Sequence, residues 1–433
     1  MQWSLSTILV IFVAILALTS GLALPKNQIF VGHSVLRINV DSQIHVKALR
    51  ALESVHGILA DFWLSPKKLP GTAHIRVTPE NRDKIVQVLN EAGMKHEIMV
   101  DDLQSLVNKE AESLAKRRIF NAGDLPTAIT TNEYHNITEI HAYLDSVGKQ
   151  YGYQVASIGK SYSNQFDLKY IKIGKNPNAT REAFINGCIH AREWLGCATM
   201  IYIINELTTK PDQYNDLLQN LNIYVMPVLN PDGYDYTWKQ DRMWRKTRSG
   251  PRQGCYGVDP NRNWDFKWGV AGSSSNPCSE TYDGPSPNSE IEVQHITKFL
   301  GDHKSTIVSY FDIHTYSEDF MFPYGYAEVY PADRTKIQSV ASTAVQAVNA
   351  VNNEQFVSGS ITDIVYPASG SSIDYTKGKL NIDYSYAMEL RPDGNAFNGF
   401  VLPEDQIVDG ATECWAGVQV AFRAAMNDMD ATG

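Results

Sequence analysis

A long alternation of strand-like and helical segments over residues 121–433 constrains the fold more than any other feature of this chain. Short apolar runs predict strands at residues 182–188, 222–228, 307–313 and 384–390. Longer segments with a helical spacing of apolar residues lie at residues 193–207, 288–299, 334–351 and 404–426. Strands that alternate with helices favour an α/β domain whose central sheet is covered by helices on both faces.

A separate, smaller block is expected at residues 28–114. Its strand patterns lie at residues 35–40, 60–64, 74–77 and 96–100, and its helical patterns at residues 46–59 and 81–92. The resulting order β-α-β-β-α-β is that of a ferredoxin-like α+β fold.

A connecting helix is expected at residues 101–114, with Asp101 or Asp102 as its N-cap. It ends in the basic cluster Lys116-Arg-Arg118. Such a cluster is often a solvated surface, but between two folded blocks of an exported protein it also marks a processing site. We predict proteolytic processing near this cluster.

The N-terminus carries an unbroken apolar run at residues 8–18, followed by the small residues Ser20, Gly21 and Ala23. The run has the length of a signal-peptide core and is short for a membrane span. We therefore predict a signal peptide and a secreted, extracellular protein, with a retained anchor as the alternative. No later segment reads as a membrane span, and the net charge of −10 argues against a nucleic-acid partner.

The chain has 5 cysteines. In an exported protein cysteines pair by default, and an odd count leaves at least one thiol unpaired. None has the C-x-x-C spacing of a structural thiolate zinc site. Asn136-Ile-Thr and Asn178-Ala-Thr are acceptor triplets for N-glycosylation, and the sequence leaves their occupancy open.

A candidate metal site begins at His190-Ala-Arg-Glu193, on the turn between an expected strand and an expected helix. The carboxyl edge of an open α/β sheet is where ligands bind, and imidazole and carboxylate both suit Zn²⁺. His314 ends another expected strand and offers a third ligand. Three protein ligands with a fourth position left to water is the catalytic zinc pattern. H-x-x-E alone is weak evidence, because it also arises by chance.

From residue 35 to the last helix the chain resembles the pancreatic A/B type of metallocarboxypeptidase. Several motifs carry this resemblance, in the right order: Gly187-Cys-Ile-His-Ala-Arg-Glu-Trp194, Arg242-Met-Trp-Arg-Lys-Thr-Arg248, Gly257-Val-Asp-Pro-Asn-Arg-Asn-Trp-Asp265, Ile313-His-Thr-Tyr-Ser317, Tyr366-Pro-Ala-Ser-Gly-Ser-Ser-Ile-Asp374 and Met388-Glu-Leu-Arg391. The resemblance implies a signal peptide at residues 1–23, an activation prosegment at 24–118 and a catalytic domain at 119–433. The catalytic domain is expected to have a mixed central sheet flanked by helices.

The resemblance also implies a role for each site residue. His190, Glu193 and His314 would hold one Zn²⁺ per chain. Glu389 would act as the general base, and Arg245 would stabilise the oxyanion. The substrate's α-carboxylate would be held by Asn261, Arg262 and Tyr366, and Arg192 would be an outer substrate contact.

Physical arguments support these roles. A carboxylate such as Glu389, in a strand with Tyr384, Tyr386 and Met388, is costly to bury unless it has a partner or a function. A guanidinium group can form two parallel hydrogen bonds with a carboxylate. Arg262 would use them to recognise the free C-terminus, as an exopeptidase must. By contrast, Arg245 taken alone would read as part of a solvated basic face, and Tyr366 as a packing aromatic. Asp259 could fix the tautomer of His190.

Specificity and disulfides are also inferred from the resemblance. It places Ile373 at the base of the side-chain pocket, where B-type enzymes carry an Asp, and so implies release of apolar or aromatic C-terminal residues. The other matched pocket positions are apolar or lack a side chain: Met321, Gly325, Ile361, Val365, Ala368 and Ala387. It implies a Cys255–Cys278 disulfide, and leaves the pairing of Cys188, Cys197 and Cys414 open.

The resemblance therefore implies a monomeric secreted zinc exopeptidase made as a zymogen. Its partners would be peptide or protein C-termini and an activating protease. Three alternatives remain: an inactive relative, which would lack a ligand or the base; a member of the regulatory branch, which carries an extra β-domain after the catalytic one; and a B-type enzyme specific for basic residues.

Overall fold

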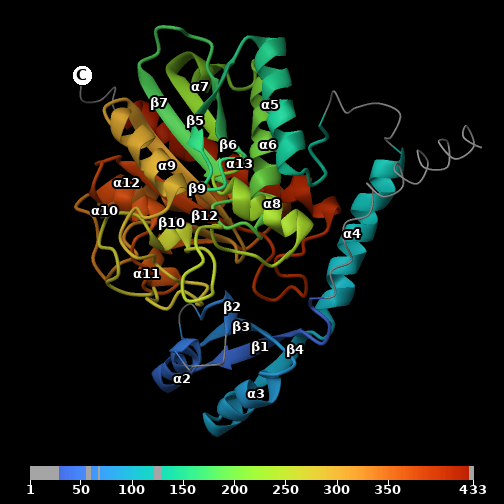
Figure 1. The fold of residues 1–433 in the computed structure, drawn as a ribbon. Helices are drawn as coiled ribbons and strands as arrows, with labels where there is room; N and C mark the ends of the chain where they lie inside the picture. The colour runs from blue at the N-terminus through green and yellow to red at the C-terminus, as the bar shows by residue number, and fades with distance from the viewer. Residues whose placement is uncertain (1–28, 55–59, 67–68, 121–128, 429–433) are drawn as a thin grey trace, which may run out of the picture.

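The computed structural model describes residues 29–54, 60–66, 69–120 and 129–428. Two parts are seen in Figure 1: an N-terminal part up to residue 120 and a larger C-terminal part from residue 129. The predicted signal peptide lies outside the described residues. Within them, no helix has the length and apolarity needed to cross a bilayer.

The N-terminal part has the predicted β-α-β-β-α-β order. Its elements are β1 (Ser34–Val40), α2 (Gln43–Ser54), β2 (Asp61–Leu64), β3 (Gly71–Val77), α3 (Arg82–Glu91) and β4 (His96–Val100). The strands form an antiparallel sheet in the order β2-β3-β1-β4. Alternate apolar residues of β1 and β3 face the two helices, and Ile38, Ile75, Ile85 and Leu89 are fully buried there.

The connecting helix α4 (Leu103–Phe120) is longer than the sequence predicted. It was expected to stop at residue 114, but its backbone stays helical through Lys116-Arg-Arg118. Ala, Lys and Arg are strong helix formers, and no Gly or Pro interrupts the segment. The predicted processing region is therefore helical in the intact chain.

The C-terminal part is built on one mixed sheet of 8 strands, in the order β11-β10-β12-β9-β7-β8-β6-β5. The strands are β5 (Gln154–Lys160), β6 (Asp167–Ile173), β7 (Arg181–Gly187), β8 (Leu221–Met226), β9 (Ile307–Thr315), β10 (Asp319–Phe322), β11 (Val357–Ser360) and β12 (Tyr384–Leu390). β8, β7, β9 and β12 run parallel to one another, so their carboxyl ends share one edge.

Helices cover both faces of this sheet, as the alternating pattern predicted. The helices are α5 (Ile137–Tyr151), α6 (Trp194–Thr209), α7 (Asn215–Asn220), α8 (Pro231–Lys239), α9 (Ile291–Asp302), α10 (Arg334–Asn352), α11 (Ile361–Ile364), α12 (Ser372–Gly378) and α13 (Ile407–Asp428), with short 3-10 turns η1 (Pro260–Arg262) and η2 (Glu404–Gln406). One core joins the sheet to α5, α6, α10 and α13, and a second joins its other face to α9 and α12.

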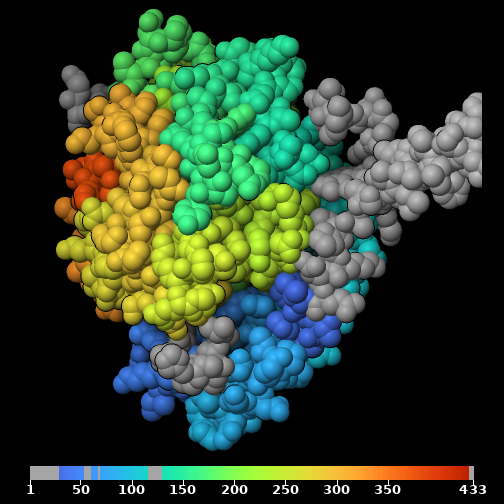
Figure 2. All heavy atoms as spheres, in the orientation of Figure 1, coloured from blue at the N-terminus to red at the C-terminus, as the bar shows by residue number. Residues whose placement is uncertain are grey.

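The N-terminal part lies against the C-terminal part at the edge where the parallel strands end. Figure 2 shows its blue surface directly below the yellow loops of the C-terminal part. A shared apolar cluster joins the two parts and includes Trp63, Val100, Met243, Tyr316 and Phe400. Any site at this edge of the sheet is therefore covered in the intact chain.

Candidate metal centre and catalytic site

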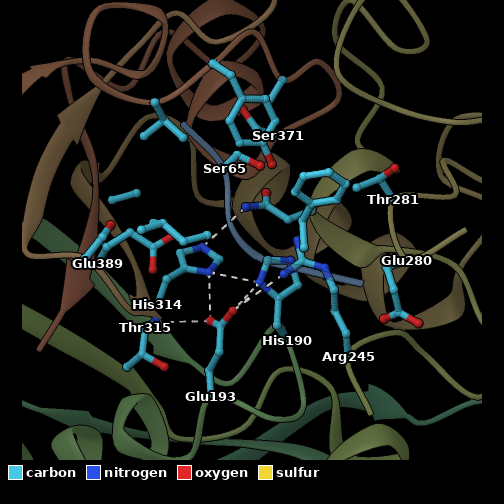
Figure 3. Close-up of a pocket in the computed structure, with 18 of the residues that line it drawn as sticks. Ser65, His190, Glu193, Arg245, Glu280, Thr281, His314, Thr315, Ser371 and Glu389 are labelled. Atoms are coloured by element: carbon cyan, nitrogen blue, oxygen red, sulfur yellow. Dashed lines mark hydrogen bonds and ion pairs between the residues drawn. The ribbon is translucent and has the colours of Figure 1, made fainter. Parts of the chain in front are cut away.

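His190, Glu193 and His314 converge at the carboxyl edge of the sheet (Figure 3). His190 and Glu193 come from the turn after β7, and His314 comes from the end of β9. Nδ1 of His190 lies 2.8 Å from Glu193 Oε1, and Nδ1 of His314 lies 3.1 Å from Glu193 Oε2. The two Nδ1 atoms are 3.2 Å apart. All three side chains are buried.

This arrangement fits a zinc ion. Ligand atoms at about 2.0–2.1 Å in a tetrahedral site lie roughly 3.3 Å from one another, close to the separations seen here. The other ring nitrogen of each histidine meets a buried carboxylate: His190 Nε2 lies 3.1 Å from Asp259 Oδ1, and His314 Nε2 lies 3.2 Å from Asp312 Oδ2. Each imidazole can therefore present Nδ1 to a cation while Nε2–H donates to a carboxylate.

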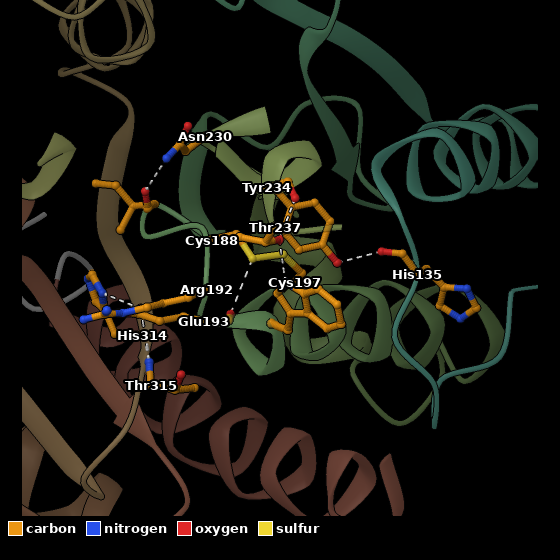
Figure 4. Close-up of a disulfide and its surroundings, with 12 residues drawn as sticks. His135, Cys188, Arg192, Glu193, Cys197, Asn230, Tyr234, Thr237, His314 and Thr315 are labelled. Carbon is orange, nitrogen blue, oxygen red and sulfur yellow. Dashed lines mark hydrogen bonds and ion pairs between the residues drawn. A yellow bond between two sulfur atoms is a disulfide. The ribbon is translucent and has the colours of Figure 1, made fainter. Parts of the chain in front are cut away.

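A disulfide closes the loop that carries the first two of these residues (Figure 4). Cys188 and Cys197 are joined, which resolves the pairing that the sequence left open. Cys188 has φ of 50°, a left-handed conformation that turns the chain sharply after β7. Cys255 and Cys278 form a second disulfide, and Cys414 is a buried free thiol.

Glu389 lies beside this centre on β12. It pairs in the sheet with His314 of the parallel strand β9. Its Oε2 is shielded from solvent and has no hydrogen-bond partner among the described residues. Burial raises the pKa of Glu389 to about 8, with the carboxylates of Glu193 and Asp319 adding to the rise and His314 opposing it. A solvent-shielded carboxylate oxygen without a hydrogen-bond partner is suited to proton transfer.

Arg245 faces the same centre from the loop after α8. Its Nη2 donates to Asp259 Oδ2 at 2.9 Å, and its Nη1 lies 3.6 Å from Glu193 Oε1. Its basic neighbours are not a solvated face: Arg242 and Lys246 are both buried. The reading of Arg245 as surface charge is therefore excluded by its surroundings.

The residues expected to hold a substrate carboxylate lie close to one another beside the centre. Asn261 and Arg262 are on η1, and Tyr366 follows α11. Arg262 Nη2 donates to the Tyr366 hydroxyl at 3.0 Å, and Asn261 Nδ2 lies 3.3 Å from His314 Nε2. Asp259 caps η1 by accepting from the backbone N–H of Asn261. These three residues form a positively charged corner next to His314.

A cavity of about 130 Å³ joins the two groups of residues. Ile373, at the start of α12, lies on its wall and is 1% exposed. The other apolar positions on this wall are Met321, Ile361, Val365, Ala368 and Ala387. Gly325 has no room for a larger side chain, because a Cβ there would lie 2.7 Å from the carbonyl oxygen of Ala368. The cavity thus offers an uncharged recess beside the positively charged corner.

The N-terminal part closes the cavity with β2 and the residues that follow it. Phe62, Trp63 and Ser65 line it. Arg192, expected as an outer substrate contact, is bound to this part in the intact chain: its Nη1 lies 2.8 Å from Asp61 Oδ1. Arg242 contributes a further ion pair, donating through Nε to Glu110 at 2.6 Å.

Several residues of this site were not found from the sequence. Asp312 was read only as part of an apolar strand, although a carboxylate in such a strand signals a buried partner. The segments that contain Asp61 and His74 predict only strands, because the partners of these side chains, Arg192 and Tyr316, lie in the other part of the chain. The Cys188–Cys197 pairing could not be predicted from the sequence, because it depends on how the turn after β7 folds back.

Comparison with known proteins agrees with this arrangement. A family profile described as zinc carboxypeptidase matches residues 140–417, and one described as carboxypeptidase activation peptide matches residues 36–110. The chain is 37% identical to carboxypeptidase A1 of Sus scrofa over 92% of this chain and 95% of that protein. It is 42% identical to carboxypeptidase B of Astacus astacus over 66% of this chain and 95% of that protein. The solved carboxypeptidase A of Helicoverpa armigera superposes with a TM-score of 0.85 at 28% identity, covering 92% of this chain and 98% of that one.

Proposed function

This chain belongs to the zinc carboxypeptidase family, and we propose that it is a secreted zymogen whose active form releases single apolar or aromatic residues from peptide C-termini. The observation that carries the proposal is a single cavity lined by the histidine-carboxylate cluster, by the positively charged corner and by an uncharged recess that includes Ile373. An exopeptidase needs these three features side by side.

His190, Glu193 and His314 are proposed to hold one zinc ion. Zinc bound by such residues acts as a Lewis acid and lowers the pKa of a coordinated water to about 7. Asp259 would hold His190 by accepting from its Nε2–H, which leaves Nδ1 free as a ligand.

Substrate binding is assigned to the positive corner. Arg262 would meet the terminal carboxylate with its planar guanidinium, while Asn261 and Tyr366 add neutral donors. Tyr366 and Arg262 are already in contact at 3.0 Å, so both would have to turn toward an incoming carboxylate. A peptide without a free terminus offers no negative charge to this corner.

Proton transfer and charge stabilisation are assigned to Glu389 and Arg245. Glu389 would take the proton of the attacking water and pass it to the leaving amine, as a general base and then a general acid. Arg245 is fixed in place by Asp259, so its guanidinium is positioned before negative charge develops on the carbonyl oxygen.

The recess determines which residue is released. A cationic side chain there would lose its hydration without a counter-charge, because Ile373 and its neighbours are apolar. Burying a large apolar side chain gains about 1.5–3 kcal/mol. We therefore propose A-type specificity, although a relative named carboxypeptidase B shares 42% identity with this chain.

Latency is assigned to the N-terminal part. Phe62 and Trp63 line the cavity, Arg192 forms an ion pair with Asp61, and Arg242 forms one with Glu110. Cleavage near Lys116-Arg-Arg118 would release the N-terminal part from the cavity, and export would follow from the predicted signal peptide.

The proposal is tested by hydrolysis of blocked dipeptides ending in Phe, Leu or Lys, before and after limited trypsin treatment. Activity should appear after cleavage, with Phe and Leu released faster than Lys. Faster release of Lys would replace the A-type assignment by a B-type one. Equal activity of the cut and uncut chains would refute latency.

A further inference from the structure

Asp312 is a fully buried carboxylate on β9, two residues before His314. Residues two apart on a strand point to the same face of the sheet, so the two side chains lie together. Asp312 Oδ1 accepts from Asn186 Nδ2 of the neighbouring strand at 2.7 Å. Its Oδ2 accepts from the Ser372 hydroxyl at 2.5 Å and lies 3.2 Å from His314 Nε2.

Nε2 of His314 has two polar neighbours with opposite requirements. The Oδ2 atom of Asp312 is an acceptor and calls for a hydrogen on Nε2. Asn261 Nδ2, 3.3 Å away, is a donor and calls for a lone pair on Nε2. The orientation of the Asn261 amide is set by its oxygen, which accepts from the backbone N–H of Ser372 at 2.9 Å.

We propose that Asp312 is a positioning residue that holds His314 as the Nε2–H tautomer, and so makes Nδ1 a metal ligand. This inference rests on the proposed zinc site. A neutral imidazole carries one hydrogen, so a hydrogen on Nε2 leaves the Nδ1 lone pair free. The alternative tautomer would place a hydrogen on Nδ1 and block coordination.

The same choice affects the substrate side of the site. When Nε2 of His314 carries a hydrogen, the Asn261 amide nitrogen finds no acceptor there. Its hydrogens are then available to a substrate carboxylate. Ser372 connects the two effects, since its hydroxyl donates to Asp312 and its backbone N–H donates to Asn261. Asp312 therefore links the metal ligand to the substrate-binding corner.

The test compares the zinc affinity of the full-length wild type, Asp312→Ala and Asp312→Asn, using competition with a chromophoric chelator. Loss of a carboxylate partner of a metal-bound histidine typically weakens metal binding about 10–100-fold, and we expect this for Asp312→Ala. Asp312→Asn keeps the shape of the side chain and one acceptor oxygen, so we expect a smaller loss of zinc affinity. It provides the comparison if Asp312→Ala does not fold. At saturating zinc, KM of the cleaved variants should rise.

The matched control is Asn186→Ala, which removes another hydrogen bond to Asp312 without touching His314. It should lower the unfolding temperature and leave the zinc dissociation constant unchanged. The inference is overturned if a folded Asp312 variant binds zinc as tightly as the wild type, or if Asn186→Ala weakens zinc binding as much as Asp312→Ala. A wild type that binds no zinc would instead refute the proposed function.

Discussion

Asp61 and Arg192 form a buried ion pair between the N-terminal part and the active-site edge of the sheet. One guanidinium nitrogen of Arg192 lies 2.8 Å and 3.0 Å from the two carboxylate oxygens of Asp61. Arg76 Nε adds a second contact to Asp61, at 2.7 Å. Burial works against the charged carboxylate, but the two guanidinium groups lower the pKa of Asp61 to about 2.

Replacing Asp61 should therefore activate the uncut chain. Asp61→Asn leaves the buried Arg192 and the half-buried Arg76 with a neutral partner. Breaking a buried pair typically costs about 3–5 kcal/mol. Each 1.4 kcal/mol lost from docking raises the open population about tenfold, so we expect at least about a tenfold gain in activity before cleavage. Exposed Asp41→Asn is the control and should behave as the wild type. Identical activity of the uncut wild type and both uncut variants would show that the Asp61–Arg192 pair does not hold the N-terminal part over the active site.

Docking of the N-terminal part onto the C-terminal part should also weaken in acid, because of His74 on β3. Its Nδ1 lies 2.7 Å from the Tyr316 hydroxyl. Burial and the charge of Arg37 lower the pKa of His74 to about 4, against the opposing effects of the Gly394 backbone and Asp393. The released state therefore binds more protons than the docked state between pH 6.5 and 4. Docking is complete above the unperturbed pKa of about 6.5 and is lost as pH falls, by up to about tenfold per pH unit.

The pH effect is measured as the affinity of the cleaved N-terminal part for the C-terminal part, between pH 7 and pH 4.5. His74→Asn should flatten the dependence, whereas His96→Asn, at a half-buried site on β4, should keep the wild-type slope. An unchanged slope in His74→Asn would assign the pH dependence to other groups.

The sequence predicted both parts of the fold because their apolar periodicities are strong. The strands β4 and β12 have the predicted bounds, at His96–Val100 and Tyr384–Leu390. The predicted length of α4 was wrong, because nothing in its sequence marks the end of a helix. The expected end at residue 114 has no Gly or Pro, and strong helix formers continue to residue 118.

Glu389→Gln should separate catalysis from metal binding. The amide cannot accept a proton but keeps the size of the side chain, so zinc should stay bound while the rate falls by about 10²–10⁴-fold. His190→Ala should lose metal and activity together. Metal analysis and an activity assay of each purified variant distinguish these outcomes. Full activity of Glu389→Gln with stoichiometric zinc would rule out its role as the base.

Ile373→Asp should change specificity without restoring the whole pocket of a B-type enzyme. The new carboxylate would be buried among Met321, Val365 and Ala387. We therefore expect kcat/KM to fall more for a peptide that ends in Phe than for one that ends in Lys. The measurement is the ratio of kcat/KM for peptides ending in Phe and Lys. A variant with an unchanged ratio would mean that Ile373 does not touch the released side chain. Ile373→Val is the matched apolar control.

The site residues that could not be predicted from the sequence were missed for one physical reason. Asp61 and His74 act through contacts with residues far away in the chain. Asp312 is held beside His314 by Asn186 and Ser372, which are also distant in the sequence. A strand pattern indicates only that a side chain faces inward. The metal ligands were found because two of them lie three residues apart and the third ends a strand at the same edge. Contacts between the two parts of the chain have no comparable local signature.

The central claim is that this chain removes residues from a free C-terminus by means of a metal held at His190, Glu193 and His314. It is tested most directly with the cleaved protein and two versions of one peptide ending in Phe, one with a free carboxylate and one amidated. The account predicts that only the free peptide is cut, that a chelator stops the reaction and that zinc restores it. Arg262→Ala should reduce kcat/KM for the free peptide by at least about a hundredfold, since charged hydrogen bonds are lost. Equal cleavage of both peptides, or activity unaffected by the chelator, would contradict the account.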